Sequence, residues 1–420
     1  MVTPSSEGAS PDSMRRHNRG LILRHVFRTG PMSRTRLAAA TGLTAAAISR
    51  ITRELIDEGL LSEGAPLVQE GRPGRRFIDL ELARDGAYVL GLGIGAYEQW
   101  LMLCGLDGHP IERLKLDIMG VGKAERAVDL AIREARRLIS RTGVDPQCVA
   151  GFGAAVAGVT DTASGTIVRS PNIGWKDVPL GARLAAALRL PVRVESLHHA
   201  LNLAEAEIGQ TRGHRDVLLI NAVLGIGASI LSGGRLIKGR TAAAGQLGHM
   251  AVAGSSEVCT CGRVGCLDTV ASGHAVLTEL GLVGRRVSPV EHGVENARLL
   301  EQAMAQANAG QRKPIAAFRA AGTRLGEAIA AVVAMVDPDA IVLAGPLSHV
   351  PAYVDAVRKS LAACFSGGLE VELLLSGLSS DRAGAMLALD SFVLSQGVGH
   401  DARERTVAGE RDLAGQPSRL

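Results

Sequence analysis

Two scarcities in the sequence narrow the classes of protein that it can encode. Only six of its 420 residues are cysteine, too few for a disulfide scaffold. No apolar stretch approaches the roughly 18 residues of a membrane span, and the first residues show no basic segment followed by an apolar run, so we expect no secretory signal. Fibres, membrane proteins and small secreted domains are excluded, and we expect a cytoplasmic protein without a membrane partner.

The composition is that of a globular protein with an uneven distribution of charge. Hydrophobic residues make up 46% and charged residues 21%, and at about 150 residues per domain the length favours two domains. Residues 14–80 contain twelve arginines, no lysine and six acidic side chains, whereas basic and acidic residues balance from residue 81 onward. Such asymmetry indicates a nucleic-acid contact near the N-terminus.

The pattern of residues 14–82 predicts a winged helix-turn-helix DNA-binding domain. Residues 1–13, which are rich in Pro, Ser, Gly and acids, look like a disordered lead. Apolar residues at helical spacing follow until Gly30, Ser33 can cap a second short helix, and Thr44 can cap a third. A strand, a Gly-Arg-Pro-Gly tip and a returning strand then complete the wing.

The third helix carries the candidate residues for reading DNA. In this motif the second helix of the pair presents its N-terminal side chains to base edges in the major groove. Arg50 has the reach for a bidentate contact with guanine, while Arg53 is better placed for phosphate. Arginines at the wing tip suit a narrow minor groove; the alternative is an ordinary solvated helix face. The predicted contacts to a double-stranded operator are Thr44, Ala45, Ala46, Ser49, Arg50, Arg53, Arg72 and Arg75.

Residues 85–395 alternate short apolar strands with helices in two similar rounds. Each round opens on a strand–glycine–strand unit, the first near residues 89–103 and the second from residue 217. This pattern predicts an α/β class and a duplicated fold of two lobes with a cleft between them. The charged segment 396–420 reads as a disordered tail.

A short cysteine-rich loop predicts a metal site. His249, Cys259, Cys261 and Cys266 offer one imidazole and three thiolates, and two intervening glycines let the loop curl. Four such ligands close a tetrahedral sphere around Zn²⁺, so the expected role is structural and not catalytic. The alternative is a set of buried, reduced cysteines beside a core histidine.

This loop and the residues before it resemble the signature of the ROK family (repressor, open reading frame, kinase): Gly245-Gln-Leu-Gly-His249, then Cys-x-Cys-Gly-x-x-Gly-Cys-Leu-Asp. The resemblance covers residues 14–395 and implies an actin-like (ribonuclease H-like) ATPase-type fold behind the winged helix-turn-helix. It places Asn172 on a sugar-contacting position and His249 on one that serves zinc and sugar. Asp268 and Gln246 stand where the family has glutamates. The implied sites for a sugar or sugar-phosphate effector are Asn172, Gln246, His249 and Asp268.

The chain departs from the family's kinases in four parts of the phosphoryl-transfer apparatus. The first phosphate loop reads Gly93-Ile-Gly-Ala-Tyr97, without the carboxylate and threonine of the kinases. Leu197 replaces the aspartate that acts as base, in a Glu-Ser-Leu-His sequence where kinases have Glu-Asn-Asp-Ala, and leucine cannot accept a proton. The second phosphate loop (223–229) and the adenosine-side glycines (344–346) also differ. We expect no catalytic residue; a substitute base would be His198 or His199.

These features favour a sequence-specific DNA-binding transcriptional regulator, a repressor, working as a homodimer or homotetramer. Its degenerate sugar-kinase domain would sense a sugar or sugar derivative and hold the subunits together. One alternative is an ATP-dependent sugar kinase, similar to a glucokinase, with an appended DNA-binding domain. The other is a scaffold that binds no ligand and serves only to dimerise or to hold another protein.

Overall fold

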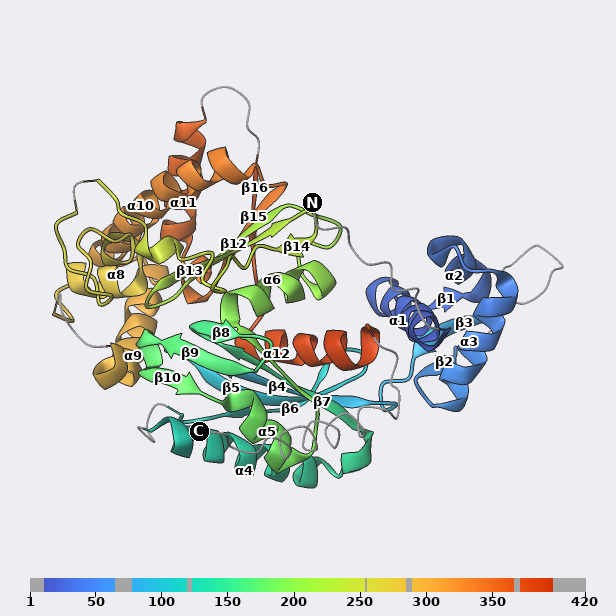
Figure 1. Cartoon of the computed structure of the whole chain (residues 1–420). Helices are drawn as coiled ribbons and strands as arrows, with labels where there is room; N and C mark the ends of the chain where they lie inside the picture. Colours follow the sequence, from blue (N-terminus) through green and yellow to red (C-terminus); the bar gives the residue numbers. More distant parts are fainter. Residues whose placement is uncertain are drawn as a thin grey trace, which may run out of the picture.

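The computed structural model describes residues 11–64, 78–118, 123–253, 255–284, 289–365 and 371–395. A small N-terminal unit sits at one end of a larger, two-lobed body (Figure 1). The expected tail, residues 1–10 of the expected lead, and the wing-tip arginines Arg72 and Arg75 lie outside the described residues. In the described part of the chain, no helix is long and apolar enough to cross a membrane.

The N-terminal unit has the three helices and the strand pairing of the predicted winged helix-turn-helix. Ser33 Oγ accepts a hydrogen bond from the Arg36 amide at 3.3 Å and Thr44 Oγ1 one from the Ala47 amide at 3.2 Å, so both predicted caps are confirmed. The first helix begins at Pro11, so the last three residues of the expected lead are helical. The elements are α1 Pro11–Thr29, β1 Met32–Ser33, α2 Arg34–Thr41, α3 Ala45–Asp57, β2 Leu61–Glu63 and β3 Asp79–Leu82, with sheet order β1-β3-β2.

The core of this unit continues into the body of the protein. Ile48, Ile51 and Leu55 of α3 have no exposed surface and belong to one hydrophobic cluster with residues of α1. The same cluster includes Val393 and Leu394, which follow the last helix of the body. The winged unit is therefore packed against the body and is not held only by its connecting chain.

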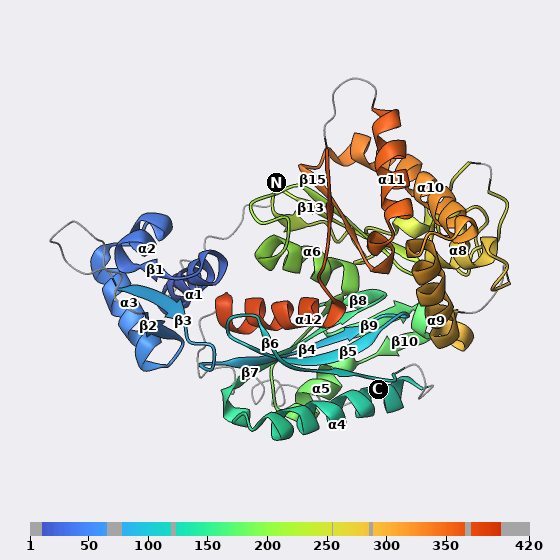
Figure 2. The same cartoon turned by 180° about the vertical axis from the view of Figure 1, so that it is seen from behind.

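The first lobe is a mixed five-stranded sheet in the order β11-β7-β4-β5-β6. Helices α4 and α5 cover one face and α12 covers the other (Figure 2). The neighbouring sheet β10-β9-β8 carries the turn that holds Asn172. The bounds are β4 Tyr88–Ile94, β5 Gln99–Gly105, β6 Pro110–Lys115, α4 Ala124–Thr142, β7 Val149–Val156, β8 Val159–Asp161, β9 Thr166–Ser170, β10 Trp175–Val178, α5 Leu180–Leu188, β11 Val192–Ser196 and α12 Ser380–Leu389.

The second lobe repeats the topology of the first. Its sheet runs β14-β13-β12-β15-β16, with the first three strands in chain order antiparallel and the last two added in parallel. The first lobe has the same order and the same strand directions, which confirms the predicted duplication. The bounds are β12 Val217–Ala222, β13 Ile226–Ser232, β14 Arg235–Leu236, α7 Asp268–Ala271, α8 Gly273–Glu279, α9 Pro289–Asn308, α10 Arg312–Val336, β15 Ala340–Ala344, α11 Pro351–Cys364 and β16 Glu372–Leu375.

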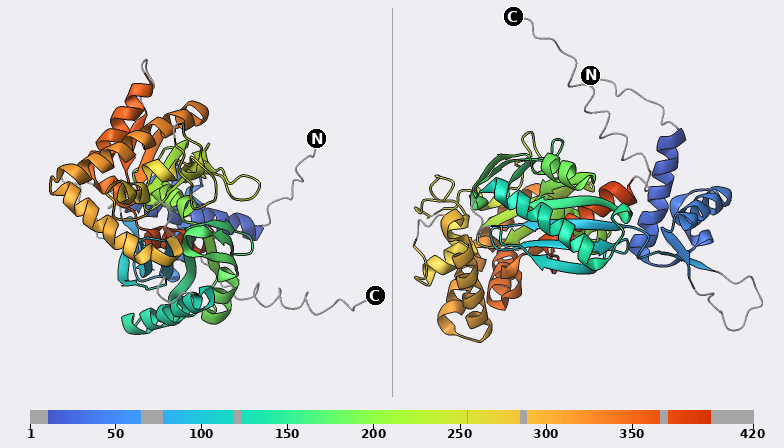
Figure 3. Two further views of the ribbon diagram at one scale, coloured as in Figure 1. Left: turned by 90° about the vertical axis from the view of Figure 1, so that its left-hand side faces the viewer. Right: turned by 90° about the horizontal axis from the view of Figure 1, so that it is seen from below.

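One helix, α6 (Leu197–Ile208), belongs to the boundary between the lobes. It follows β11 of the first lobe, packs against α12, and contacts β12 and β13 of the second lobe. The winged unit lies at one end of the body and α8 and α9 at the other (Figure 3). Since α6 touches both lobes, a change in the angle between them must move it.

Candidate functional site

The predicted DNA-reading face of α3 is exposed. Ile48 and Ile51 of the same helix are buried. The predicted contact residues are all accessible to solvent: Thr44, Ala45, Ala46, Ser49, Arg50 and Arg53. The Arg50 guanidinium lies 3.1 Å from Glu54 one turn later, with 60% of its side chain exposed. Exposed pairs of this kind contribute about 0.3–0.5 kcal/mol, so Arg50 can exchange Glu54 for a base edge at little cost.

Glu207, at the end of α6, holds the winged unit on the body. It is 7% exposed and accepts hydrogen bonds from Arg24 Nη1 at 2.6 Å, Arg28 Nε at 2.7 Å and Arg28 Nη2 at 2.6 Å. Hydrogen bonding to Glu207 raises the pKa of Arg28. We call Arg24, Arg28 and Glu207 the α1–α6 clamp, and no sequence signal had pointed to it.

Further contacts reinforce the clamp. Arg24 pairs with Asp390 and donates to Ser395 Oγ at 2.8 Å. Arg212, just beyond α6, donates to the Arg28 carbonyl at 3.1 Å. Gly20 of α1 lies so close to the Leu394 carbonyl that a Cβ there would collide with it. Figure 1 shows the ends of α6 and α12 pointing toward α1.

The other end of α6 lies at the junction of the lobes. Glu195, the penultimate residue of β11, is 1% exposed and pairs with Lys238 of the second lobe. The His199 Nδ1 atom lies 3.2 Å from the same carboxylate. Burial would raise the pKa of Glu195, but His199 and Lys238 outweigh it and lower the pKa to about 2. The carboxylate is thus a permanent charge that ties the start of α6 to both lobes.

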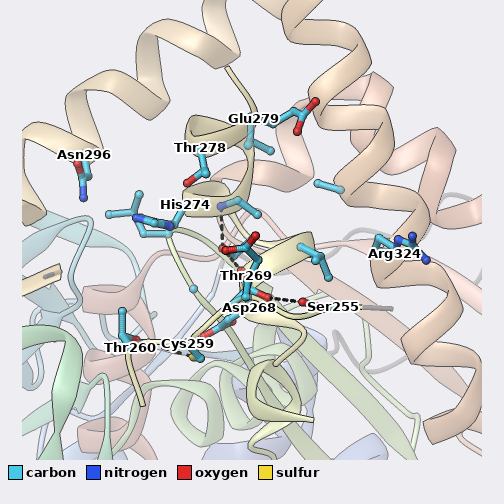
Figure 4. A pocket seen from close by; sticks show the side chains of 18 of the residues that line it. Ser255, Cys259, Thr260, Asp268, Thr269, His274, Thr278, Glu279, Asn296 and Arg324 are labelled. Carbon is cyan, nitrogen blue, oxygen red and sulfur yellow. Dashed lines mark hydrogen bonds between the residues drawn. The ribbon is translucent and has the colours of Figure 1, made fainter. Parts of the chain in front are cut away.

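The cleft contains a cavity of about 550 Å³ that is lined by residues of both lobes, among them Asn172 and Asp268. Figure 4 shows Asp268 among the residues of the second lobe that line it. The two side chains approach one another: a Cβ placed on Gly225 would be 3.5 Å from Asp268 Oδ2 and 3.6 Å from Asn172 Nδ2. Asp268 accepts a hydrogen bond from the Ile226 amide at 2.7 Å, and burial raises its pKa to about 7. A ligand at this point can contact both lobes at once.

The other two predicted ligand residues differ in placement. The His249 Nδ1 atom lies 3.9 Å from Asp268 Oδ2, which brings the metal loop next to the ligand cavity. Gln246 is exposed and does not line the cavity. Of the four residues implied by the resemblance, the structure groups Asn172, Asp268 and His249, and it leaves Gln246 apart.

The residues of the predicted metal site converge. The ligand atoms of His249, Cys259, Cys261 and Cys266 all lie within 4.8 Å of one another. The Cys261 and Cys266 sulfurs are 3.7 Å apart, as are Cys259 Sγ and His249 Nδ1. A tetrahedral Zn²⁺ with bonds of about 2.3 Å to sulfur places its ligand atoms about 3.6–3.8 Å apart, so this donor set fits the ion.

The positions that match the kinase phosphate loops are covered by side chains of the chain itself. Tyr97 reaches from the first lobe to α9, where its hydroxyl donates to Glu301 at 3.1 Å. The His198 ring lies on Gly227 of the second loop, where a Cβ would collide with it. Burial lowers the pKa of His198 to about 4, so the ring is neutral at pH 7. Leu197 is buried in the core cluster.

A model of the family described as "ROK family" matches residues 89–391. The chain belongs to the ROK family. A second model, described as a winged helix-turn-helix DNA-binding domain, matches residues 15–62. Both confirm the resemblance found in the sequence, and together with the fold they confirm a DNA-binding unit in front of a ROK-family body.

Curated relatives align along most of the chain. The putative xylose repressor of Caldicellulosiruptor sp. is 29% identical over 79% of this chain and 84% of its own. The DNA-binding transcriptional repressor Mlc of Escherichia coli is 26% identical over 91% and 95% of the two chains. The dual regulator NagC of Escherichia coli is 26% identical over 88% and 92%. Each of these alignments spans more of this chain than the ROK-family match alone, which covers residues 89–391.

Solved structures show the same architecture. A ROK-family transcriptional regulator described as a homologue of Escherichia coli Mlc superimposes with a TM-score of 0.73 over 92% of this chain and 98% of that one, at 24% identity. A ROK-family glucokinase from Streptomyces griseus, solved with glucose and AMPPNP, superimposes with a TM-score of 0.61 and 28% identity. It covers 72% of this chain and 98% of its own.

Proposed function

We propose that this ROK-family protein is a transcriptional repressor whose affinity for operator DNA is controlled by a sugar bound between the two lobes. The observation that carries the proposal is the course of α6, which starts at the lobe junction and ends at the α1–α6 clamp on the winged unit. The exposed face of α3 supplies the DNA contact. Relatives named as xylose and N-acetylglucosamine repressors support this class of effector.

Binding to an operator by this motif normally requires two copies, because each recognition helix reads one half-site and the half-sites lie about 34–36 Å apart. We therefore infer a homodimer or homotetramer. A sugar that contacts Asn172 of one lobe and Asp268 of the other would favour one angle between the lobes. Because α6 is fixed to both lobes and to α1, that change would shift the winged unit and alter the spacing of the paired recognition helices.

We also infer a structural Zn²⁺ held by His249, Cys259, Cys261 and Cys266. The ion would close a four-ligand sphere and stabilise the loop that precedes Asp268. Its support is the convergence of the four ligand atoms. Because His249 lies next to Asp268, the ion would also fix one wall of the ligand cavity.

The second candidate activity, ATP-dependent phosphorylation of a sugar, is not favoured. Leu197 cannot act as a base, and His199, a candidate substitute, is held by Glu195. The other candidate, His198, lies on Gly227, where the kinase pattern predicts a nucleotide phosphate. We therefore infer that the cleft retains a ligand-binding half and has lost its phosphoryl-transfer half.

The replacement Arg50→Ala tests the DNA-binding role. A bidentate contact to a base contributes about 1–3 kcal/mol, so affinity for an operator defined by footprinting upstream of the protein's own gene should fall by about 5- to 150-fold. Arg133→Ala, in an equally exposed ion pair on α4, is the matched control and should bind as the unaltered protein does. Equal affinities of the two variants would contradict the assignment of α3 as the reading helix.

A further inference from the structure

Besides Asn172 and Asp268, the cavity in the cleft is lined by residues of α8, α9 and α10, among them His274, Asn296 and Arg324 (Figure 4). Two polar side chains in this part of the cavity, which we call the extension, each have a buried atom without a partner in the described part of the chain. His274 Nε2 and Thr278 Oγ1 are buried without a hydrogen bond. A third polar side chain, Asn296, is 2% exposed and also lines the cavity.

The side chains of His274, Thr278 and Asn296 line the same part of the cavity. His274 and Thr278 are four residues apart on α8, so they lie on the same side of that helix. Asn296 comes from α9, which packs against α8. Buried polar groups are nearly always hydrogen-bonded in folded proteins, because leaving them unpaired is costly. Two such groups, with the buried Asn296 beside them, therefore indicate a ligand that supplies the missing partners.

The chemistry of the extension indicates an uncharged guest. The Thr278 hydroxyl and the Asn296 amide are neutral, and burial lowers the pKa of His274, so its ring is neutral at pH 7. Glu279 and Arg324 also line the cavity, but both are exposed and of opposite charge. A phosphate or carboxylate would find no cation among the three buried groups, whereas hydroxyl groups can both donate to them and accept from them.

We propose that the cavity takes an uncharged carbohydrate larger than a single pyranose ring. One ring would contact Asn172 and Asp268, and a second ring or aglycone would contact His274, Thr278 and Asn296. The volume of about 550 Å³ lies within the range of about 300–1,000 Å³ that is typical of small-molecule sites. The inference rests on the proposed sugar-sensing function and makes the effector a glycoside or disaccharide, not a sugar phosphate.

Calorimetry on the full-length protein tests this assignment. Glucose, xylose, cellobiose, xylobiose and glucose 6-phosphate are the probes. We expect at least one disaccharide to bind more tightly than its monosaccharide, and glucose 6-phosphate to bind no better than glucose. The replacement Thr278→Val keeps the shape of the side chain and removes the hydroxyl, so it should raise the Kd of the disaccharide about fivefold, the value of one neutral hydrogen bond. The Kd of the monosaccharide should not change.

Two comparisons keep the test decisive. Thr323→Val on α10, whose hydroxyl bonds to the carbonyl of Arg319 in its own helix, is the matched control and should leave both constants unchanged. Asn296→Ala should act on the disaccharide as Thr278→Val does. If monosaccharides bind but the disaccharides bind no better, or if neither variant changes the Kd of a disaccharide, the extension holds only water and the inference is wrong. If no sugar binds at all, the proposed sugar sensing itself is wrong.

Discussion

The α1–α6 clamp makes the strongest prediction, because a single carboxylate holds the winged unit to the helix between the lobes. Replacement of Glu207 by glutamine keeps the size of the side chain and removes its charge. The oxygen of the glutamine amide can still accept a hydrogen bond from one arginine. Its NH₂ group is a donor, so it cannot accept the hydrogen bonds that the second carboxylate oxygen accepted. Arg24 and Arg28, with 26% and 43% of their side chains exposed, would turn toward water.

The expected loss follows from the number and exposure of the contacts. Glu207 accepts three charge-assisted hydrogen bonds and is itself largely buried. A hydrogen bond to a charged group contributes about 1.5–3 kcal/mol when buried, whereas exposed ion pairs contribute about 0.2–1 kcal/mol. Between these limits we expect Glu207→Gln to weaken docking of the winged unit by about 2 kcal/mol, or about 30-fold in the docking equilibrium.

Hydrogen exchange and DNA binding measure the two consequences. Amide exchange in α1 should become faster in Glu207→Gln, while exchange in α4 should stay the same. Operator DNA should still bind, because the face of α3 is unaltered, but a sugar that binds by calorimetry should no longer change the affinity for DNA. The control is Glu295→Gln, which removes the same charge from an exposed pair with Arg298 on α9. Unchanged protection of α1 together with a full sugar response would refute the role of the clamp.

Three further predictions concern the metal, the chemistry and the pH dependence. Cys261→Ser should lower the zinc content below one ion per chain and lower the Tm, because a closed site contributes to folding. The control Cys364→Ser, at an exposed cysteine on α11, should change neither quantity. If metal analysis finds no zinc in the unaltered protein, the site is wrong. No ADP should form from ATP with glucose, N-acetylglucosamine, mannose or xylose. Leu197→Asp should not produce turnover, because His198 still covers Gly227. If ADP is released and Asn172→Ala abolishes the release, the protein is a kinase. The pKa of His198 is about 4 in the folded protein and 6.5 in the unfolded chain, so the unfolded chain binds one more proton between these pH values. The free energy of unfolding should therefore fall by about 2–3 kcal/mol as the pH drops from 6.5 to 4. If a His198→Ala variant shows the same pH dependence, His198 is not its source.

Local features of the sequence predicted a large part of the fold. Ser33 and Thr44 act as caps because the hydrogen bond they accept is made within three residues, so no distant contact is needed to identify them. The metal loop was recognisable for the same reason, since its three cysteines lie within eight residues. The duplication of the two lobes was visible because both rounds of strands begin with the same kind of strand–glycine–strand unit.

Contacts between distant segments could not be predicted in this way. Glu207 lies 179 residues from Arg28, and a single acidic residue near the end of a helix carries no sign of its partner. The position of His198 on Gly227 depends on the packing of α6 against β13, which the sequence does not specify. Gln246 was placed with the ligand residues because it matched a family position, but the turn that carries it leaves the side chain exposed.

If the cleft senses a sugar, as proposed above, it needs a ligand-binding half but no phosphoryl-transfer half. A ligand shifts an equilibrium between two conformations only by the difference in its affinity for them, so a sensor needs contacts from both lobes at one point. Asn172 and Asp268 provide them, because both lie within 3.6 Å of a Cβ on Gly225. Phosphate binding and a base add nothing to that difference. Leu197 instead packs into the core cluster at the start of α6, and the His198 ring covers Gly227. Because charged contacts hold α6 at both ends, a displacement of one lobe would be passed through this helix to α1.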